Sequence, residues 1–123
     1  MRAYTDDYDN AAAVAWSRTV TSPLLAMLRD SEDGEELDTP VAVDERRAVA
    51  TCLKPADRGG AGSILRVWET AGQSGPVAIA VPGFSRAIRT DLLERDQEEL
   101  CVVGGSVSVP LAAHGFGAIR LLR

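Results

Sequence analysis

The feature that most constrains this chain is a set of short segments in which apolar residues alternate with small or polar ones. In residues 77–81 (VAIAV) every second residue is branched and apolar, and in residues 106–111 (SVSVPL) valines alternate with serines. Successive side chains of a strand point to opposite faces, so this pattern places one row of each segment in a core. Gly104–Gly105 separates two such segments, which is typical of a tight hairpin. The pattern predicts an all-β antiparallel β-sandwich of about seven to eight short strands.

The N-terminal third of the chain lacks this alternation. Residues 11–20 (AAAVAWSRTV) favour a short helix, which we expect to end before Pro23 because proline disfavours helix in the residue before it. Residues 30–39 are mostly acidic and predict a solvated loop. We therefore expect an N-terminal extension over residues 1–39, partly packed on a sandwich domain over residues 40–123.

Charge and hydropathy exclude several classes of protein. The formal net charge is −5, so the chain should repel nucleic acid. No apolar run approaches the roughly 20 residues that span a bilayer, and residues 1–10 lack the pattern of a secretory signal. Cys52 and Cys101 do not make a disulfide framework, and we expect two inert, partly buried thiols. These features predict a cytoplasmic protein without nucleic-acid or membrane partners.

No set of residues predicts a catalytic or metal centre. His114 is the single histidine and stands in a predicted turn, so one histidine and two distant cysteines do not supply the three or four ligands of a zinc site. The carboxylates between residues 91 and 99 can be close in space without catalysis, and we interpret them as a charged loop between strands. We therefore predict no catalytic residue and no metal ligand in this chain.

The pair Trp68–Glu69 has two interpretations. A tryptophan beside a glutamate at the end of a strand can stack on a sugar and hydrogen-bond to it. The alternative, which the pattern favours, is a core tryptophan followed by an exposed carboxylate at the edge of a strand.

An ordered set of motifs resembles a known family. Taken together, the segments are similar to the C-terminal domain of glycoside hydrolase family 38, which contains the α-mannosidases. The resemblance covers roughly residues 20–122 and rests, in chain order, on SPLL (22–25), VATCLKP (49–55), LRVWE (65–69), GPVAIAVP (75–82), TDLLE (90–94), EEL (98–100) and GFGAIRLL (115–122).

The resemblance implies that the active site lies in another domain. The family's N-terminal α/β barrel binds zinc and supplies an aspartate nucleophile for retaining hydrolysis, and none of its motifs occurs here. The resemblance thus implies a non-catalytic sandwich that is inactive alone, packs against the catalytic domain and borders its sugar cleft. The carbohydrate-contact candidates are Trp68, Glu69, Asp91 and Glu94, and zinc is expected only in the catalytic domain.

Two alternatives stay open. A stand-alone carbohydrate-binding module would use Trp68, although aromatic residues make up only 5% of the chain. A protein-interaction module would dock to a partner or to a second copy through an exposed apolar patch, for which residues 23–28 are a candidate. The possible partners are therefore a catalytic domain, an oligosaccharide or another copy of the chain.

Overall fold

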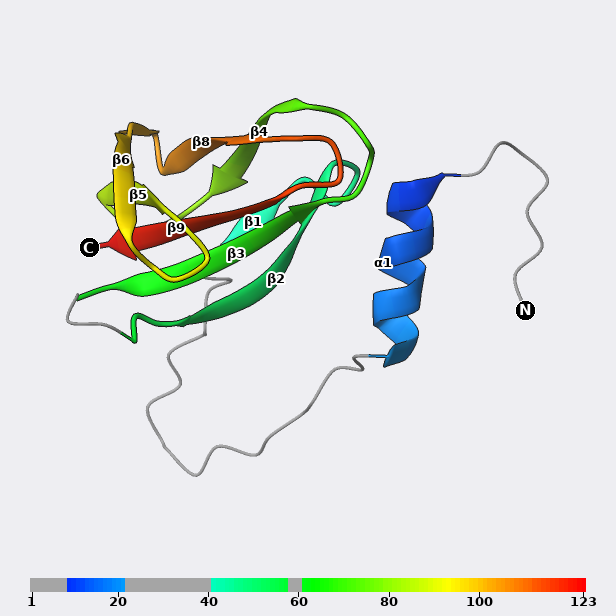
Figure 1. The fold of residues 1–123 in the computed structure, drawn as a ribbon, viewed down its shortest axis with the longest axis horizontal. Coiled ribbons are helices and arrows are strands. Elements are labelled where there is room, and N and C mark those ends of the chain that lie inside the picture. Colours follow the sequence, from blue (N-terminus) through cyan, green and yellow to red (C-terminus); the bar gives the residue numbers. More distant parts are fainter. Residues whose placement is uncertain (1–8, 22–40, 58–60) are drawn as a thin grey trace.

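The computed structural model describes residues 9–21, 41–57 and 61–123, and these form one helix and two antiparallel sheets (Figure 1). The elements are α1 (Asn10–Thr21), β1 (Ala42–Val43), β2 (Ala48–Pro55), β3 (Ser63–Glu69), β4 (Gly75–Ala80), β5 (Arg86–Thr90), β6 (Asp96–Leu100), β7 (Val102–Val103), β8 (Ser106–Leu111) and β9 (Phe116–Leu122). The all-β sandwich expected from the sequence is confirmed.

The smaller sheet has the strand order β1-β4-β8-β7. Its two long strands alternate as the sequence predicts: Val77 and Ile79 of β4 are buried, as are Val107 and Val109 of β8. The hairpin between β7 and β8 turns at Gly104–Gly105, where both residues have positive φ angles of 58° and 73°. Such angles suit glycine, which has no Cβ to clash.

The larger sheet has the order β2-β3-β9-β5-β6, so the last strand of the chain occupies its centre. β9 pairs with β3 on one side and with β5 on the other. Four consecutive residues of β9, Ala118 to Leu121, are buried. Both faces of this strand are therefore covered, one by the smaller sheet and the other by the connection between β5 and β6.

The hydrophobic core lies between the two sheets. Its largest fully buried side chains are leucine, isoleucine and valine, which fill the space between facing sheets. The core comprises Ala48, Leu65, Val67, Val77, Ile79, Val81, Ala87, Val107, Val109, Leu111, Ile119 and Leu121.

Two expectations about local structure are wrong. Residues 96–99, expected in a charged loop, belong to strand β6. Among the described residues this strand pairs with β5 alone, and its side chains are mostly exposed, so no apolar alternation marks it in the sequence. Cys101 is exposed instead of partly buried, because it lies between β6 and β7 outside the core, whereas Cys52 on β2 is half-buried.

The helix α1 matches the segment expected to be helical. The backbone N–H of Ala12 donates to the Asp9 carboxylate at 3.1 Å, which is a capping contact at the start of the helix. The apolar segment 23–28 and the acidic segment 30–39 lie outside the described residues. In the part of the chain that the structure describes, no helix combines the length and the apolar character needed to cross a bilayer.

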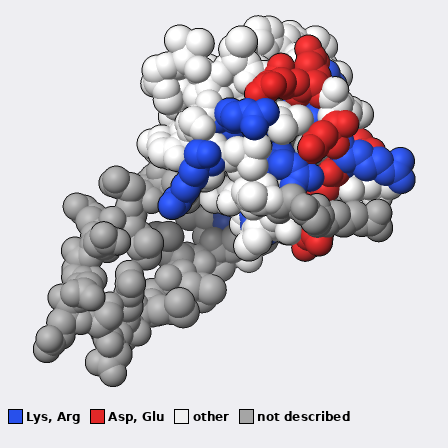
Figure 2. Space-filling view, turned by 90° about the vertical axis from the view of Figure 1, so that its left-hand side faces the viewer, with Lys and Arg blue, Asp and Glu red and all other residues white. Residues whose placement is uncertain are grey.

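Acidic and basic side chains are interleaved on the side of the molecule that carries β6 (Figure 2). Arg86 and Glu99, on neighbouring strands β5 and β6, form an exposed ion pair at 2.9 Å. No separate basic patch stands out in this view, in keeping with the negative net charge.

Candidate functional site

A group of charged side chains with specific contacts lies on the outer face of the larger sheet. The strand register puts Lys54 of β2, Ile64 of β3 and Arg120 of β9 in one row across the sheet. Arg66 follows two residues after Ile64 on the same face. Three cationic side chains from three neighbouring strands therefore meet on one surface.

The connection between β5 and β6 folds back over this surface. The Asp91 carboxylate accepts hydrogen bonds from the backbone N–H groups of Leu93 and Arg95, at 2.8 and 2.9 Å. Glu94 has a φ angle of 64°, which is unusual for a residue other than glycine. The side chain of Asp91 and the left-handed backbone of Glu94 together give the loop its shape.

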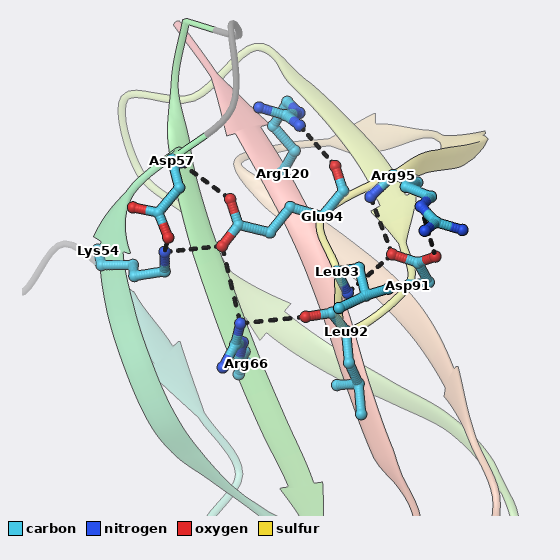
Figure 3. Close-up of polar contacts among 9 residues, drawn as sticks. All are labelled: Lys54, Asp57, Arg66, Asp91, Leu92, Leu93, Glu94, Arg95 and Arg120. Atoms are coloured by element: carbon cyan, nitrogen blue, oxygen red, sulfur yellow. Dashed lines mark hydrogen bonds and ion pairs between the residues drawn. The ribbon is translucent and has the colours of Figure 1, made fainter.

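Glu94 closes the loop onto the sheet (Figure 3). One carboxylate oxygen lies 2.7 Å from Lys54 Nζ and 3.7 Å from Arg66 Nη2, and the other accepts the backbone N–H of Asp57 at 2.9 Å. The carbonyl oxygen of Glu94 accepts a hydrogen bond from Arg120 Nη2 at 2.9 Å. The loop is thus joined to β2, β3 and β9 by polar contacts that we call the Glu94 cluster: Lys54, Asp57, Arg66, Glu94 and Arg120.

Neighbouring charges fix the protonation states in this cluster. The hydrogen bond from Lys54, together with the Asp57 amide and the Arg66 charge, holds the pKa of Glu94 below its usual value. The hydrogen bonds to Asp57 and Glu94 raise the pKa of Lys54. Both groups are therefore charged at neutral pH, and Glu94 is a poor proton donor there.

A second buried carboxylate, Glu69, lies at the end of β3. The side chain is fully buried and accepts four backbone hydrogen bonds of 2.9–3.2 Å, from residues 71, 72, 73 and 114. Burial would raise the pKa of Glu69, but the four N–H donors outweigh this effect and lower it. Glu69 therefore ties the loop after β3 to the turn between β8 and β9.

The aromatic side chains beside Glu69 face outward. Trp68 is half-buried on the outer face of the larger sheet and stacks on its register partner Phe116, with ring centroids 5.7 Å apart and planes 12° apart. The indole N–H of Trp68 donates to the carbonyl oxygen of His114 at 3.2 Å. Phe116 is 62% exposed, so this end of the sheet presents an open aromatic surface.

Comparison with protein-family models gives one match. Residues 47–114, more than half of the chain, match the C-terminal beta sandwich domain of glycosyl hydrolases family 38. The chain belongs to this family of domains. No curated protein and no solved structure matches the chain.

The four candidate residues of this family 38 domain do not form one site. Trp68 and Glu69 are adjacent but point to opposite faces, since side chains alternate along β3. Asp91 and Glu94 share the loop between β5 and β6, and their carboxylates contact different partners (Figure 3). The favoured interpretation of the first pair, a core tryptophan with an exposed carboxylate, is wrong. Glu69 occupies the core face at the end of β3, after Leu65 and Val67.

The sequence interpretation missed the partners of these residues. Lys54, Arg66 and Arg120 belong to the quoted motifs LKP, LRVWE and IRLL, and they meet Glu94 of TDLLE in the Glu94 cluster. The sequence feature that could have indicated this cluster is therefore the set of motifs, since three of them place one cationic residue in a strand. His114 is exposed in a turn, as expected.

The histidine, cysteine and carboxylate side chains of the described residues are not grouped as metal ligands. No group of three or more histidine, cysteine or carboxylate side chains suited to a metal ion occurs among residues 9–21, 41–57 and 61–123. The buried carboxylates Glu69 and Glu94 are both occupied by contacts that join loops to strands. The chemistry that this arrangement supports is ionic and hydrogen-bonded stabilisation of the fold.

Proposed function

We propose that this chain is the non-catalytic C-terminal sandwich of an α-mannosidase-like family 38 glycoside hydrolase, where it packs against the catalytic α/β barrel. The observation that carries the proposal is the Glu94 cluster. The motif residues that resemble the family contact one another, and they join the β5–β6 loop to three strands. Their role is to build a shaped surface.

Retaining hydrolysis needs a nucleophilic carboxylate and a protonated acid about 5–5.5 Å apart. Glu69 and Glu94 both have pKa values below the usual range, so neither is the acid at neutral pH. A sugar hydroxyl would have to displace backbone amides or Lys54 to reach them. The zinc ion and the reacting groups therefore belong to the catalytic region in this proposal.

The tip of the β5–β6 loop is the contact that we assign to the catalytic region. Leu92 and Leu93 are 58% and 59% exposed. Their backbone is held on both sides, because Arg66 Nη2 donates to the Leu92 carbonyl at 3.2 Å and Asp91 accepts the Leu93 N–H (Figure 3). The two adjacent leucines therefore form an exposed apolar surface. Because the backbone of the loop is already fixed, little conformational entropy is lost when this surface binds a partner.

An activity and association experiment tests this function. The purified chain should not cleave a chromogenic α-mannoside, and it should bind the separately expressed catalytic region of the family 38 protein that contains it. Leu92→Asp with Leu93→Asp should abolish this association. Val103→Asp should leave it unchanged, since Val103 is 75% exposed on the smaller sheet. Turnover by the chain alone that a chelator removes would contradict the proposal.

The proposed location is the cytoplasm. The two cysteines of the chain are both free thiols, Cys52 half-buried and Cys101 exposed. Free thiols are typical of reducing compartments, where disulfides are rare.

A stand-alone carbohydrate-binding module is the second candidate function. The open aromatic surface of Trp68 and Phe116 favours it, because the two rings are nearly parallel and Phe116 is mostly exposed.

A further inference from the structure

The stacked rings of Trp68 and Phe116 lie beside the backbone of the turn between β8 and β9, at the end of β3. Trp68 and Phe116 are register partners on the outer face of the larger sheet. His114 is exposed two residues before Phe116, and its carbonyl oxygen accepts the Trp68 indole N–H. These side chains belong neither to the Glu94 cluster nor to the tip of the β5–β6 loop.

The backbone that carries these rings is fixed from inside the domain. The His114 N–H donates to the buried Glu69 carboxylate at 2.9 Å, and its φ angle of 55° is left-handed although it is not a glycine. A Cβ on Gly72 would lie 2.9 Å from His114 Nε2, so the imidazole ring lies directly over this glycine. The position of the imidazole is therefore set by contacts of its backbone and of its ring.

We propose that Trp68, Phe116 and His114 form a binding site for a pyranose ring of an oligosaccharide. The rings of Trp68 and Phe116 lie 12° from parallel, and Phe116 is 62% exposed, so an open apolar ring face is available. One face of a pyranose presents C–H groups, which pack on such a surface, while its hydroxyl groups project at the edge. The imidazole of the exposed His114 carries ring nitrogens that can hydrogen-bond to such hydroxyls.

The choice of a sugar as ligand rests on the proposed function, since the family is one of glycosyl hydrolases. The geometry adds that the site is preorganised. Aromatic side chains lose little conformational entropy on binding, and here the indole is already fixed by its hydrogen bond to His114. An open platform with few polar contacts fits weak affinity, with a dissociation constant on the order of 1 mM.

Fluorescence of a variant with one tryptophan tests this site directly. The chain has two tryptophans, so Trp16→Phe leaves Trp68 as the only one. Titration of this full-length variant with methyl α-mannoside and with α-linked mannose oligosaccharides should give saturable changes in emission. Mannitol, which has similar hydroxyl groups but no ring, should give none.

Further variants separate ring stacking from simple apolar contact. Phe116→Leu keeps an apolar side chain without the ring, and we expect about tenfold weaker binding. His114→Asn removes the imidazole but tolerates the left-handed backbone, and we expect binding to weaken several-fold. Val103→Ala, an exposed change on the other sheet, should bind like the parent variant. Thermal unfolding of each variant establishes that it is folded.

Two results would overturn the proposed site. One is the absence of saturation at sugar concentrations on the order of 100 mM, far above the expected dissociation constant. The other is a Phe116→Leu variant that binds sugar like the parent but no longer associates with the catalytic region, which would assign the rings to the interface between domains. If the chain associates with the catalytic region but shows no sugar binding, this site is rejected and the proposed function stands. If the chain binds sugar but does not associate with the catalytic region, the site stands and the proposed function is rejected.

Discussion

Two buried carboxylates hold loops at opposite ends of β3, and they do so through different kinds of contact. Glu69 accepts only backbone N–H groups, whereas Glu94 contacts side-chain cations and one backbone N–H. Glu69 therefore holds two loops together without a counter-charge in hydrogen-bonding contact, since Arg47 Nε lies 3.7 Å away. Glu94 depends on charge, and its contribution should respond to pH and salt.

Replacing Glu69 with alanine should destabilise the domain strongly. The change removes the acceptor of four N–H groups, and buried donors without partners cost free energy. We expect the free energy of unfolding to fall by about 3 kcal/mol in urea denaturation. The exposed Glu98→Ala is the control and should change it by less than about 0.5 kcal/mol. Equal effects of the two changes would contradict the structural role of Glu69.

Acid should weaken the Glu94 cluster. The pKa of Glu94 is lowered in the folded state. Its contribution to stability is therefore complete above its pKa in the unfolded chain, about 4.3, and is lost as the pH falls through its pKa in the folded state. The melting temperature of the parent chain should therefore drop between about pH 5 and pH 3. Glu94→Gln should be less stable at pH 7 and should show a shallower acid dependence.

The control for this pH dependence is Glu98→Gln, which changes an exposed carboxylate of β6. Its melting temperature should follow the parent curve. A Glu94→Gln variant with the parent's acid dependence would show that other carboxylates dominate it.

At the scale of single residues, the sequence pointed to the important carboxylates but gave them the wrong environment. Glu94 belongs to TDLLE and Glu69 to LRVWE, and both are anchors of the fold. Alternation along β3 would have placed Glu69 on the same face as Leu65 and Val67. The partners of Glu94 come from strands far apart in the chain, and only the strand register brings them together.

Among the elements, β6 is notable because an acidic strand forms the edge of the larger sheet. Its residues Asp96 to Glu99 are exposed, and β5 is its single strand partner among the described residues. An open edge can pair with another chain, and charged side chains discourage this. The same acidic composition hid β6 in the sequence, where the long apolar strands were recognised by their alternation.

Removing charge from this edge should cause self-association. The double change Gln97→Val and Glu98→Val raises strand propensity and removes repulsion between two edges. We expect the apparent mass to rise with concentration in light scattering. The control Glu45→Val removes one exposed carboxylate from a turn and should leave the mass unchanged. A double variant that stays monomeric would show that the edge is protected in another way.

For the whole molecule, the two sheets and their core lie within residues 41–123 of the described chain. The boundary between extension and sandwich expected near residue 40 stays a prediction. Deleting residues 1–40 should leave a cooperatively folding domain whose melting temperature falls by only a few degrees. Deleting residues 1–55 removes β1 and β2 as well and should prevent folding. Circular dichroism and thermal unfolding distinguish these outcomes, and an unfolded product of the shorter deletion would place the boundary elsewhere.

The strand order of the larger sheet also has a consequence for how the protein is made. β9 follows the other strands of this sheet in sequence and separates β3 from β5. The central strand of the sheet is therefore synthesised after the strands that flank it. Before that moment β2–β3 and β5–β6 exist only as two hairpins without a common partner, and non-local pairing of this kind is slow. A nascent chain that stalls before residue 116 would expose both unpaired edges to chaperones and proteases.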